Sequence, residues 1–390
     1  MPKERLRAII FVLVAFMLGC NEYVIVGVLP DVAHEFHVSL SSLGYVVTIF
    51  ALVYAVATPV ITAVAGRWPR HRVLLTLIGV FLVGNTWSAL AHSYWSLVLS
   101  RVLTATVAGA IISLVLVIAA FVASPKQRAS LVSWIFAGFS IASVIGVPIG
   151  TLVSQHLTWH DSFWMITWLT VLVLALLAWV VPHDTPQVKS HLKDQLTLFG
   201  DRRVLVGVSF IVAVCAADYT FYTYIRPLLT TVLGFNDTWL NWLLLMMGVF
   251  FIIGNKFGGF LADRGGVKRL PGMYVLMTVM LLLLAPSFRW PFVTVGLIAL
   301  VCVTLAGYGA STQLMFLNIA EEDYPQSLDL ASSLNSIFAN IGISLGSLTA
   351  AETVHYLGLT KVGYVAAIYG VLATLLVVLA AKWRDAKRVR

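Results

Sequence analysis

Charged side chains are scarce in this chain of 390 residues, and their scarcity decides its class. Asp, Glu, Lys and Arg together make up 11% of the residues, whereas soluble globular domains carry about 25%. Apolar residues reach 60%, and they gather in long runs. Since about 20 helical residues cross the hydrocarbon core of a bilayer, these runs predict a membrane protein.

Signatures of catalysis are missing as well. The sequence has no phosphate-binding P-loop, no His-Glu-x-x-His metal motif and no nucleophile elbow on a strand-to-helix turn. Its three cysteines, Cys20, Cys215 and Cys302, stand alone in apolar runs and indicate neither disulfides nor a metal site. We therefore expect no enzyme activity and no cofactor. Without a nucleotide site, ion gradients remain as the energy source.

Twelve apolar runs follow one another with only short connections between them. This pattern predicts an all-α polytopic membrane protein with twelve transmembrane helices and no separate soluble domain. The runs cover residues 8–30, 42–65, 73–91, 95–122, 131–154, 163–181, 204–227, 240–262, 270–286, 291–319, 329–353 and 362–381.

Basic residues lie mainly on one side of this arrangement. With the amino terminus placed in the cytoplasm, 20 of the 25 Lys and Arg residues fall in cytoplasmic segments, three on the opposite side and two inside runs. This asymmetry follows the positive-inside rule. It predicts a multi-pass protein of the cell (inner or plasma) membrane with both termini cytoplasmic. The net charge of +8 therefore reflects topology, and we expect no nucleic-acid partner.

The two halves of the chain share the spacing of an acid and a proline. An offset of 197 residues carries Pro30 to Pro227. The same offset carries Asn21 to Asp218, so the acid of the second half lies one position away from the match of Glu22. Such a shared spacing indicates one ancestral half used twice.

The polar stretch 182–203 separates six runs from the next six. We therefore predict two six-helix bundles, 1–181 and 204–390, joined by a cytoplasmic linker over 182–203. A second echo supports them, because the glycine-rich segment 146–150 resembles segment 342–346. An even number of spans in each half makes the pseudo-repeat parallel, and internal repeats of this kind are typical of secondary transporters.

Five segments carry a resemblance to a known family: NEYVIVGVLPDVA, GRWPRHRVLL, SRVLTATVAGA, GVPIGTLVSQHLTWHDSFW and GNKFGGFLADRGGVKR. In this order they resemble the major facilitator superfamily, in particular its drug:proton antiporter branch, which includes sugar efflux permeases of the arabinose type. The resemblance covers essentially the whole chain. It implies the major facilitator fold and a monomer in the lipid bilayer whose partners are a small-molecule substrate and protons.

Glu22 is the first candidate for proton coupling. An ionised carboxylate at the bilayer centre costs about 2.5–3.5 kcal/mol, so such residues usually face a cavity or a partner. We expect Glu22 to exchange protons and to contact the substrate together with Asn21 and Tyr23. The alternative is a hydrogen-bonded acid that only ties helices together. The acid matches the family pattern, whereas Asn21 and Tyr23 replace its usual Thr and Phe.

Asp218 is the counterpart of Glu22 in the second half. Tyr219 and Tyr222 lie beside it, and aromatic rings next to a buried acid suit a cavity wall for amphipathic or cationic molecules. We expect Asp218 to take part in proton coupling and the three side chains to contact the substrate. Alternatively, the tyrosines belong to an aromatic belt near the outer interface.

Arg101 is the one arginine that lies well inside an apolar run. An arginine in this fourth-span motif is associated with proton transfer in the resembling family, which makes Arg101 the third candidate for proton coupling. Snorkelling toward the interface is the alternative. In later runs, Gln313 and Asn335 are candidate substrate contacts.

Gly146, Pro148 and Gly150 form a conformational motif in the fifth run. Small residues four apart let helices approach closely, and a proline permits a kink. The family associates this motif with the direction of antiport. Ordinary close packing is the other interpretation.

The basic turns after the second and eighth runs form another conformational motif. The family pattern begins with an aspartate, and Gly66 stands in that place before Arg67 and Arg72. The second half keeps the acid in Asp263, followed by Arg264, and this pair is a candidate cytoplasmic gate. Positive-inside anchoring is the simpler explanation for the arginines.

Together these features predict a proton-coupled secondary transporter that exports drugs or sugar-like compounds by alternating access. A proton-coupled uptake symporter with the same fold is the nearest rival. A non-transporting membrane receptor or scaffold is the third possibility, and it would not require acids inside the membrane.

Overall fold

The computed structural model describes residues 3–65, 68–122, 128–181, 196–324 and 327–388. Within these ranges all regular structure is helical, and 12 helical stretches are long and apolar enough to cross a membrane. The predicted fold class and number of spans are thereby confirmed.

Contacts within the chain divide it into two compact units. The first comprises Met1–Ser39 and Ile49–Ser190, and the second comprises Leu40–Thr48 and His191–Arg390. Residues 182–195, which form most of the predicted linker, lie outside the described residues.

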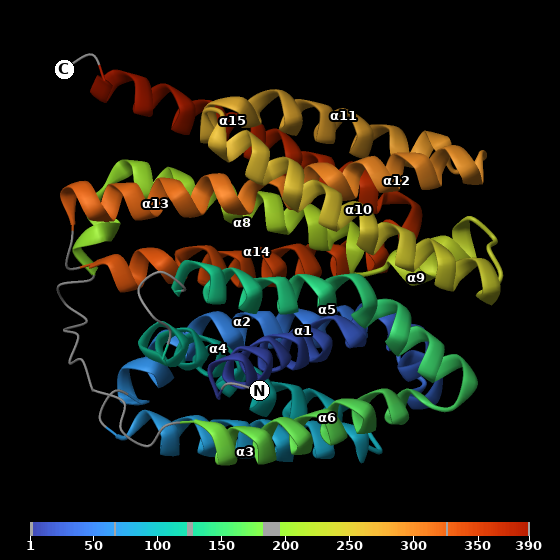
Figure 1. Cartoon of the computed structure of the whole chain (residues 1–390). Helices are drawn as coiled ribbons and strands as arrows, with labels where there is room; N and C mark the ends of the chain where they lie inside the picture. The colour runs from blue at the N-terminus through green and yellow to red at the C-terminus, as the bar shows by residue number, and fades with distance from the viewer. Residues whose placement is uncertain (1–2, 66–67, 123–127, 182–195, 325–326, 389–390) are drawn as a thin grey trace. The chain divides into compact units, whose positions relative to one another are not determined.

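Long helices joined by short turns make up the first unit (Figure 1). The start of the sixth helix is fixed by a capping box, in which Thr158 and Asp161 each accept a hydrogen bond from the other's backbone N–H. The helices are α1 (Lys3–Phe36), α2 (Leu40–Ala65, shared with the second unit), α3 (Arg70–Ala89), α4 (Tyr94–Val122), α5 (Arg128–His156) and α6 (Trp159–Val180).

Helices of the second unit are interrupted more often by short 3₁₀ and π turns. One of its spans combines α12 and α13 through a 3₁₀ turn at Ala306–Tyr308. The elements are η1 (Leu196–Gly200), α8 (Arg202–Tyr222), α9 (Ile225–Pro227), η2 (Leu228–Val232), α10 (Asp237–Asp263), η3 (Gly266–Arg269), α11 (Leu270–Ser287), α12 (Pro291–Leu305), η4 (Ala306–Tyr308), α13 (Gly309–Asp323), α14 (Leu328–Tyr356), η6 (Leu359–Lys361) and α15 (Val362–Arg388).

Close contact between α1 and α5 organises the first unit. Gly146 and Gly150 of α5 face α1, and a Cβ atom added at Gly146 would lie 3.0 Å from that of Tyr23. The hydroxyl of Thr151 also donates a hydrogen bond to the backbone oxygen of Gly27 at 3.2 Å. Small residues let the two helices approach until a side chain reaches the opposite backbone.

The second unit repeats this packing between α8 and α14. Gly342 and Gly346 of α14 lie against the backbone of α8. The hydroxyl of Thr220 on α8 donates to the backbone oxygen of Gly346 at 3.3 Å. The segments 146–150 and 342–346, matched in the sequence, therefore make the same kind of helix contact in their own units.

The predicted seventh span, 204–227, is broken near its end. α8 stops at Tyr222, and the chain continues through the short α9 and a π turn. Pro227 explains the break, because its ring lacks an N–H and clashes with the carbonyl four residues earlier, at Thr223. Pro30 in the first half stays inside a continuous α1, so the two halves differ here.

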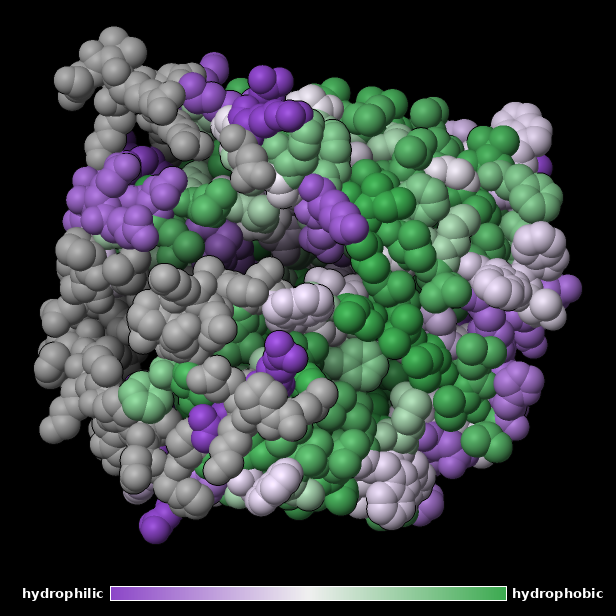
Figure 2. Space-filling view, viewed as in Figure 1, coloured by the Kyte–Doolittle hydropathy of each residue, from purple (hydrophilic) through white to green (hydrophobic). Residues whose placement is uncertain are grey.

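Apolar side chains cover the surface around the middle of the helices. Figure 2 shows hydrophobic residues across the centre of this face and hydrophilic residues gathered toward the helix ends. Many large apolar side chains are exposed, including Trp168, Trp179 and Leu375. A surface of this kind suits the hydrocarbon interior of a bilayer rather than water.

Candidate functional site

The middle of α1 presents two adjacent polar residues to the interior of the first unit. Asn21 is fully buried and Glu22 is half-buried. Arg101 of α4 is 1% exposed, so a guanidinium lies in the core of the helices. The structure therefore brings these three sequence candidates together.

A chain of hydrogen bonds links Arg101 to α1 and α3. Its Nη1 donates to Oδ1 of Asn21 at 2.9 Å. The Nδ2 of Asn21 donates to Oδ1 of Asn85 on α3. Finally, Nδ2 of Asn85 donates to the backbone oxygen of Phe81 at 2.9 Å. The arginine is thus held by neutral groups.

Aromatic rings also hold the guanidinium of Arg101. Its carbon lies 4.1 Å from the centre of the Phe50 ring and 5.8 Å from that of Phe163. Such cation–π contacts stabilise a charge that has lost its water. They fix the plane of the guanidinium but satisfy none of its N–H groups.

Two donors of Arg101 remain unused. Nε and Nη2 are buried and have no hydrogen-bond partner within the described chain. Glu22 interacts with Arg101 electrostatically, yet no ion pair within 4.0 Å joins Glu22 to any described basic side chain. An unpaired buried donor is costly. Two donors of the buried guanidinium are therefore left without an acceptor from the described residues, in the neighbourhood of a carboxylate.

Asp218 occupies a different kind of environment in the second unit. It is half-buried on α8, and its Oδ1 is buried without a hydrogen-bond partner in the described chain. It interacts electrostatically with Tyr222, with Tyr274 of α11 and with Cys302 of α12. No described basic side chain forms an ion pair with it. The second acid therefore stands without a cation.

The predicted aromatic partners of Asp218 are packed into the unit. Tyr219 and Tyr222 are both buried, and their rings meet edge to face at 6.2 Å. Tyr222 also meets Phe251 of α10 at 5.6 Å. These contacts place the two rings in the interior rather than in an exposed outer belt.

Gln313 and Asn335 meet in a polar cluster between α13 and α14. Nδ2 of Asn335 donates to Oε1 of Gln313 at 2.9 Å and to the backbone oxygen of Gly309 at 3.1 Å. Its Oδ1 accepts from the hydroxyl of Thr312 at 2.9 Å. The amide of Asn335 is thus fully engaged in tying two helices together.

The conformational motif of α5 lies against the site helix. Gly146 faces Tyr23 and Cys20, and Gly150 faces Val24, all on α1. Pro148 is buried between these two glycines, inside a continuous α5. Tyr23 is half-buried and meets Phe139 of α5 edge to face. The motif therefore sets how closely α5 approaches the segment that carries Glu22.

The basic turns are described only in part. Arg67 lies outside the described residues, and Arg72 is exposed in the first turn of α3. Asp263 ends α10, and its side chain is not described. Arg264 follows it, with its guanidinium 3.8 Å from the centre of the Phe260 ring. The predicted cytoplasmic gate therefore stays a prediction.

Sequence reasoning did not find Asn85, although it completes the hydrogen-bonded chain. An isolated asparagine in an apolar run resembles any helix-tying residue. Its one signal was that an amide buried inside a span needs a partner. Sequence reasoning also missed a charged cluster, in which Arg203 binds Asp201 at 2.5 Å and also pairs with Asp323.

The sequence predicts that this cluster lies on the cytoplasmic side. Burial of Asp201 opposes its ionisation, but hydrogen bonds and positive charge from Arg203 outweigh that effect and lower the pKa of Asp201. The ion pair between Arg203 and Asp323 joins the start of α8 to the end of α13. It ties these two helices of the second unit together at their ends.

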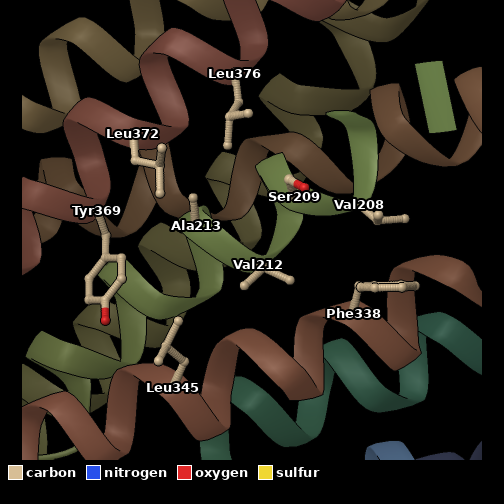
Figure 3. A pocket seen from close by; sticks show the side chains of 9 residues that line it. All are labelled: Val208, Ser209, Val212, Ala213, Phe338, Leu345, Tyr369, Leu372 and Leu376. Atoms are coloured by element: carbon tan, nitrogen blue, oxygen red, sulfur yellow. The ribbon is translucent and has the colours of Figure 1, made fainter. Parts of the chain in front are cut away.

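A cavity of about 380 Å³ opens between α8, α14 and α15 (Figure 3). Apolar side chains such as Leu345 and Leu372 line most of it, and Ser209 and Tyr369 contribute hydroxyl groups. The hydroxyl of Tyr369 is bonded to that of Thr349 at 2.7 Å. None of the candidate site residues lines this cavity. Among the described residues there is also no cluster of three or more His, Cys, Asp or Glu that could hold a metal ion.

Comparison with known proteins places this geometry in a family. The model of the Major Facilitator Superfamily matches residues 11–347. The chain is 30% identical to the uncharacterized MFS-type transporter YtbD of Bacillus subtilis, over 93% of this chain and 92% of that one. It is 27% identical to a probable sugar efflux transporter of Helicobacter acinonychis, over 94% and 93%.

Solved structures show the same fold at low sequence identity. A bacterial homologue of the human lysosomal transporter Spinster, inward-facing and unoccupied, superposes with a TM-score of 0.81 at 17% identity over 98% of both chains. A D-xylose–proton symporter gives 0.75 at 16% identity over 95% of this chain and 96% of that one. The chain therefore belongs to the Major Facilitator Superfamily and is a multi-pass membrane transporter, not an enzyme.

Proposed function

We propose that this chain is a proton-coupled exporter of small molecules, either drugs or sugar-like compounds. The observation that carries the proposal is the unpaired carboxylate of Glu22 beside the buried guanidinium of Arg101. Charges at this depth are costly, and they typically mark substrate or proton pathways. Glu22 is the primary proton carrier in this proposal.

In this proposal the substrate and a proton compete for the carboxylate of Glu22, and this competition couples substrate export to proton entry. Ionised Glu22 accepts hydrogen bonds from hydroxyl or ammonium groups of a substrate, whereas a protonated carboxyl accepts them less well. A proton that reaches Glu22 from outside therefore weakens substrate binding. Release of that proton to the cytoplasm restores the site for the next substrate molecule.

Arg101 favours substrates that carry oxygen. Its Nε and Nη2 donors are buried without partners, and a hydroxyl group can accept from them while it donates to Glu22. A polyhydroxylated compound therefore matches both charges at once. The name of the probable sugar efflux transporter supports this class. The apolar helices and the Phe50 ring next to Arg101 also suit lipophilic drugs.

The remaining candidates take supporting roles in the proposal. Asp218 is the second proton-coupling residue, in the second unit. Gly146, Pro148 and Gly150 allow α5 to shift against α1 during alternating access. Substrate contacts come from Asn21, Tyr23, Tyr219, Tyr222 and Gln313, with Asn335 holding Gln313 in place. The protein lies in the inner membrane with both termini cytoplasmic, as the distribution of basic residues indicates.

The fold leaves the direction of transport open. A proton-coupled uptake symporter remains the second candidate function, since the D-xylose–proton symporter shares this fold. Export is supported by the resemblance of the α5 motif to that of exporters and by the sugar efflux relative.

Vesicles containing the purified protein test the proposal. A panel of sugars and lipophilic cations is offered while internal pH and substrate are followed together. The variants are Glu22→Gln and Asp218→Asn. Glu321→Gln serves as the control, because it makes the same change at an exposed position at the end of α13.

Opposite movement of substrate and protons, lost in Glu22→Gln and kept in Glu321→Gln, is the expected result. Parallel movement would establish the symporter instead. Unimpaired uphill transport in both Glu22→Gln and Asp218→Asn would refute the coupling role of these acids.

A further inference from the structure

Asn85 joins the site through hydrogen bonds alone. Its side chain is fully buried in α3, where Nδ2 donates to the backbone oxygen of Phe81 one turn earlier. Its neighbours Thr86 and Ser88 also donate to carbonyls four residues before them. Asn85 differs because its Oδ1 accepts from Asn21 of α1. It thereby connects the backbone of α3 to the residue that holds the guanidinium.

Only one orientation of the two asparagine amides satisfies this chain of hydrogen bonds. A guanidinium can only donate, and a backbone carbonyl can only accept. Asn21 and Asn85 lie between Arg101 and the Phe81 carbonyl, so each must turn its oxygen toward Arg101 and its amide nitrogen toward Phe81. Reversing either amide would set two donors or two acceptors face to face. The orientation of Asn21 is therefore fixed from both ends.

The fixed amide decides what Arg101 binds. A neutral oxygen occupies its Nη1, and the guanidinium forms no ion pair within 4.0 Å with Glu22. Glu22 is the one acid available to it, because no other charged side chain lies in the middle of the described helices of the first unit. Nε and Nη2 have no partner within the described chain and still do not pair with Glu22, so the bond from Nη1 to Asn21 holds the guanidinium in an orientation away from the acid. If Asn21 turned away, the guanidinium could reorient, and the carboxylate would be its strongest acceptor in the middle of these helices.

We propose that Asn85 is a positioning residue that keeps Arg101 from closing onto Glu22. It braces Asn21, and Asn21 holds the guanidinium in a neutral contact. The inference rests on the proposed role of Glu22 as the proton carrier, because an acid locked to a buried arginine exchanges protons poorly. The brace thus preserves a carboxyl that can be protonated.

Chemical labelling of Glu22 tests the inference without a known substrate. Dicyclohexylcarbodiimide reacts with protonated carboxyl groups in apolar surroundings, and mass spectrometry locates the adduct. The purified full-length protein is labelled in lipid vesicles at mildly acidic pH. Glu22→Gln identifies the signal that belongs to Glu22.

Two substitutions remove the brace. Asn85→Leu abolishes both hydrogen bonds. Asn85→Ser keeps a hydroxyl that can bond to the Phe81 carbonyl but is too short to reach Asn21, so it preserves folding if the leucine does not. Asn340→Ser is the matched control, because Asn340 donates to the carbonyl of Ser336 in the same way and its Oδ1 has no partner within the described chain.

The expected result is a fall in Glu22 labelling on the order of tenfold in both Asn85 variants, the scale of one hydrogen bond to a charged group. Asn340→Ser should label like the wild type. A purely structural role would loosen α1 and raise labelling, so unchanged or faster labelling overturns the inference. So does the absence of Glu22 labelling in the wild type. Failure of the proposed exporter function appears separately, as missing proton movement in the vesicle assay.

Discussion

Gly27 of α1 lies where α1 packs closely against the backbone of α5. A Cβ atom added there would lie 2.6 Å from the backbone oxygen of Val147 and 2.8 Å from the hydroxyl oxygen of Thr151. A carbon this close to backbone cannot be relieved by turning a side chain, so α1 and α5 would have to separate. Gly27→Ala should therefore destabilise the protein.

The magnitude follows from two opposing effects. Replacing glycine by alanine in a helix stabilises it by about 0.5–1 kcal/mol, and overpacking costs about 1–3 kcal/mol. The separated helices also weaken the hydrogen bond from Thr151 to Gly27. We expect a net loss of about 1–2 kcal/mol.

Thermal unfolding of the detergent-solubilised protein measures this loss. Gly79→Ala is the internal control, because nothing lies within 4 Å of the added Cβ and α3 should gain helix stability. The midpoint should fall for Gly27→Ala and stay or rise for Gly79→Ala. Equal midpoints for the two variants would refute the close-packing argument.

Three further predictions concern charged groups. Arg101→Lys should lower vesicle transport about tenfold or more, because an ammonium cannot bind Asn21 and stack flat on Phe50 at once; unchanged transport would contradict this. The pKa of Asp201 is lowered in the folded chain. Ionised Asp201 therefore stabilises the fold fully above its unfolded pKa of about 3.9, and this stabilisation is lost as the pH falls through the lower folded pKa. Unfolding by acid should accordingly depend less on pH in Asp201→Asn than in the wild type. Identical acid-unfolding curves for the two proteins would contradict this expectation. Glu35→Ala removes the carboxylate that accepts a hydrogen bond from the indole N–H of Trp159 at 2.6 Å. Trp159 is 2% exposed, so its N–H would be left buried without this acceptor and the free energy of unfolding should fall by about 1–3 kcal/mol. A loss no larger than that caused by a substitution at an exposed surface position would argue against this role.

Most of the fold could be predicted because the bilayer restricts the possible structures so strongly. Backbone groups in hydrocarbon must be bonded internally, so a long apolar run can hardly be anything but a helix. The sequence repeat between 146–150 and 342–346 also corresponds to the same kind of helix packing in the two units. The break after Tyr222 was missed, because Pro30 and Pro227 match in sequence while only the second interrupts its helix.

The site could be predicted only in part. Glu22 and Arg101 were visible because charge in an apolar run is costly, and that cost does not depend on which helices are neighbours. Asn85 was not visible, since its importance comes from a bond to another helix that periodicity does not reveal. Asn335 is the opposite case. Its sequence position suggests a substrate contact, but its side-chain amide is already hydrogen-bonded to neighbouring groups of α13.

The unequal charges of the two units have a consequence for the electrical behaviour of the protein. In the first unit an ionised Glu22 is balanced by Arg101, whereas an ionised Asp218 has no described cation paired with it in the second. Moving one elementary charge across the membrane field changes the free energy by about 2.3 kcal/mol per 100 mV. When both acids are ionised, the field acts on the unbalanced charge of Asp218 and on the opposite charges of Glu22 and Arg101, whose effects largely cancel. The membrane potential should therefore act differently on the two acids of the duplicated halves.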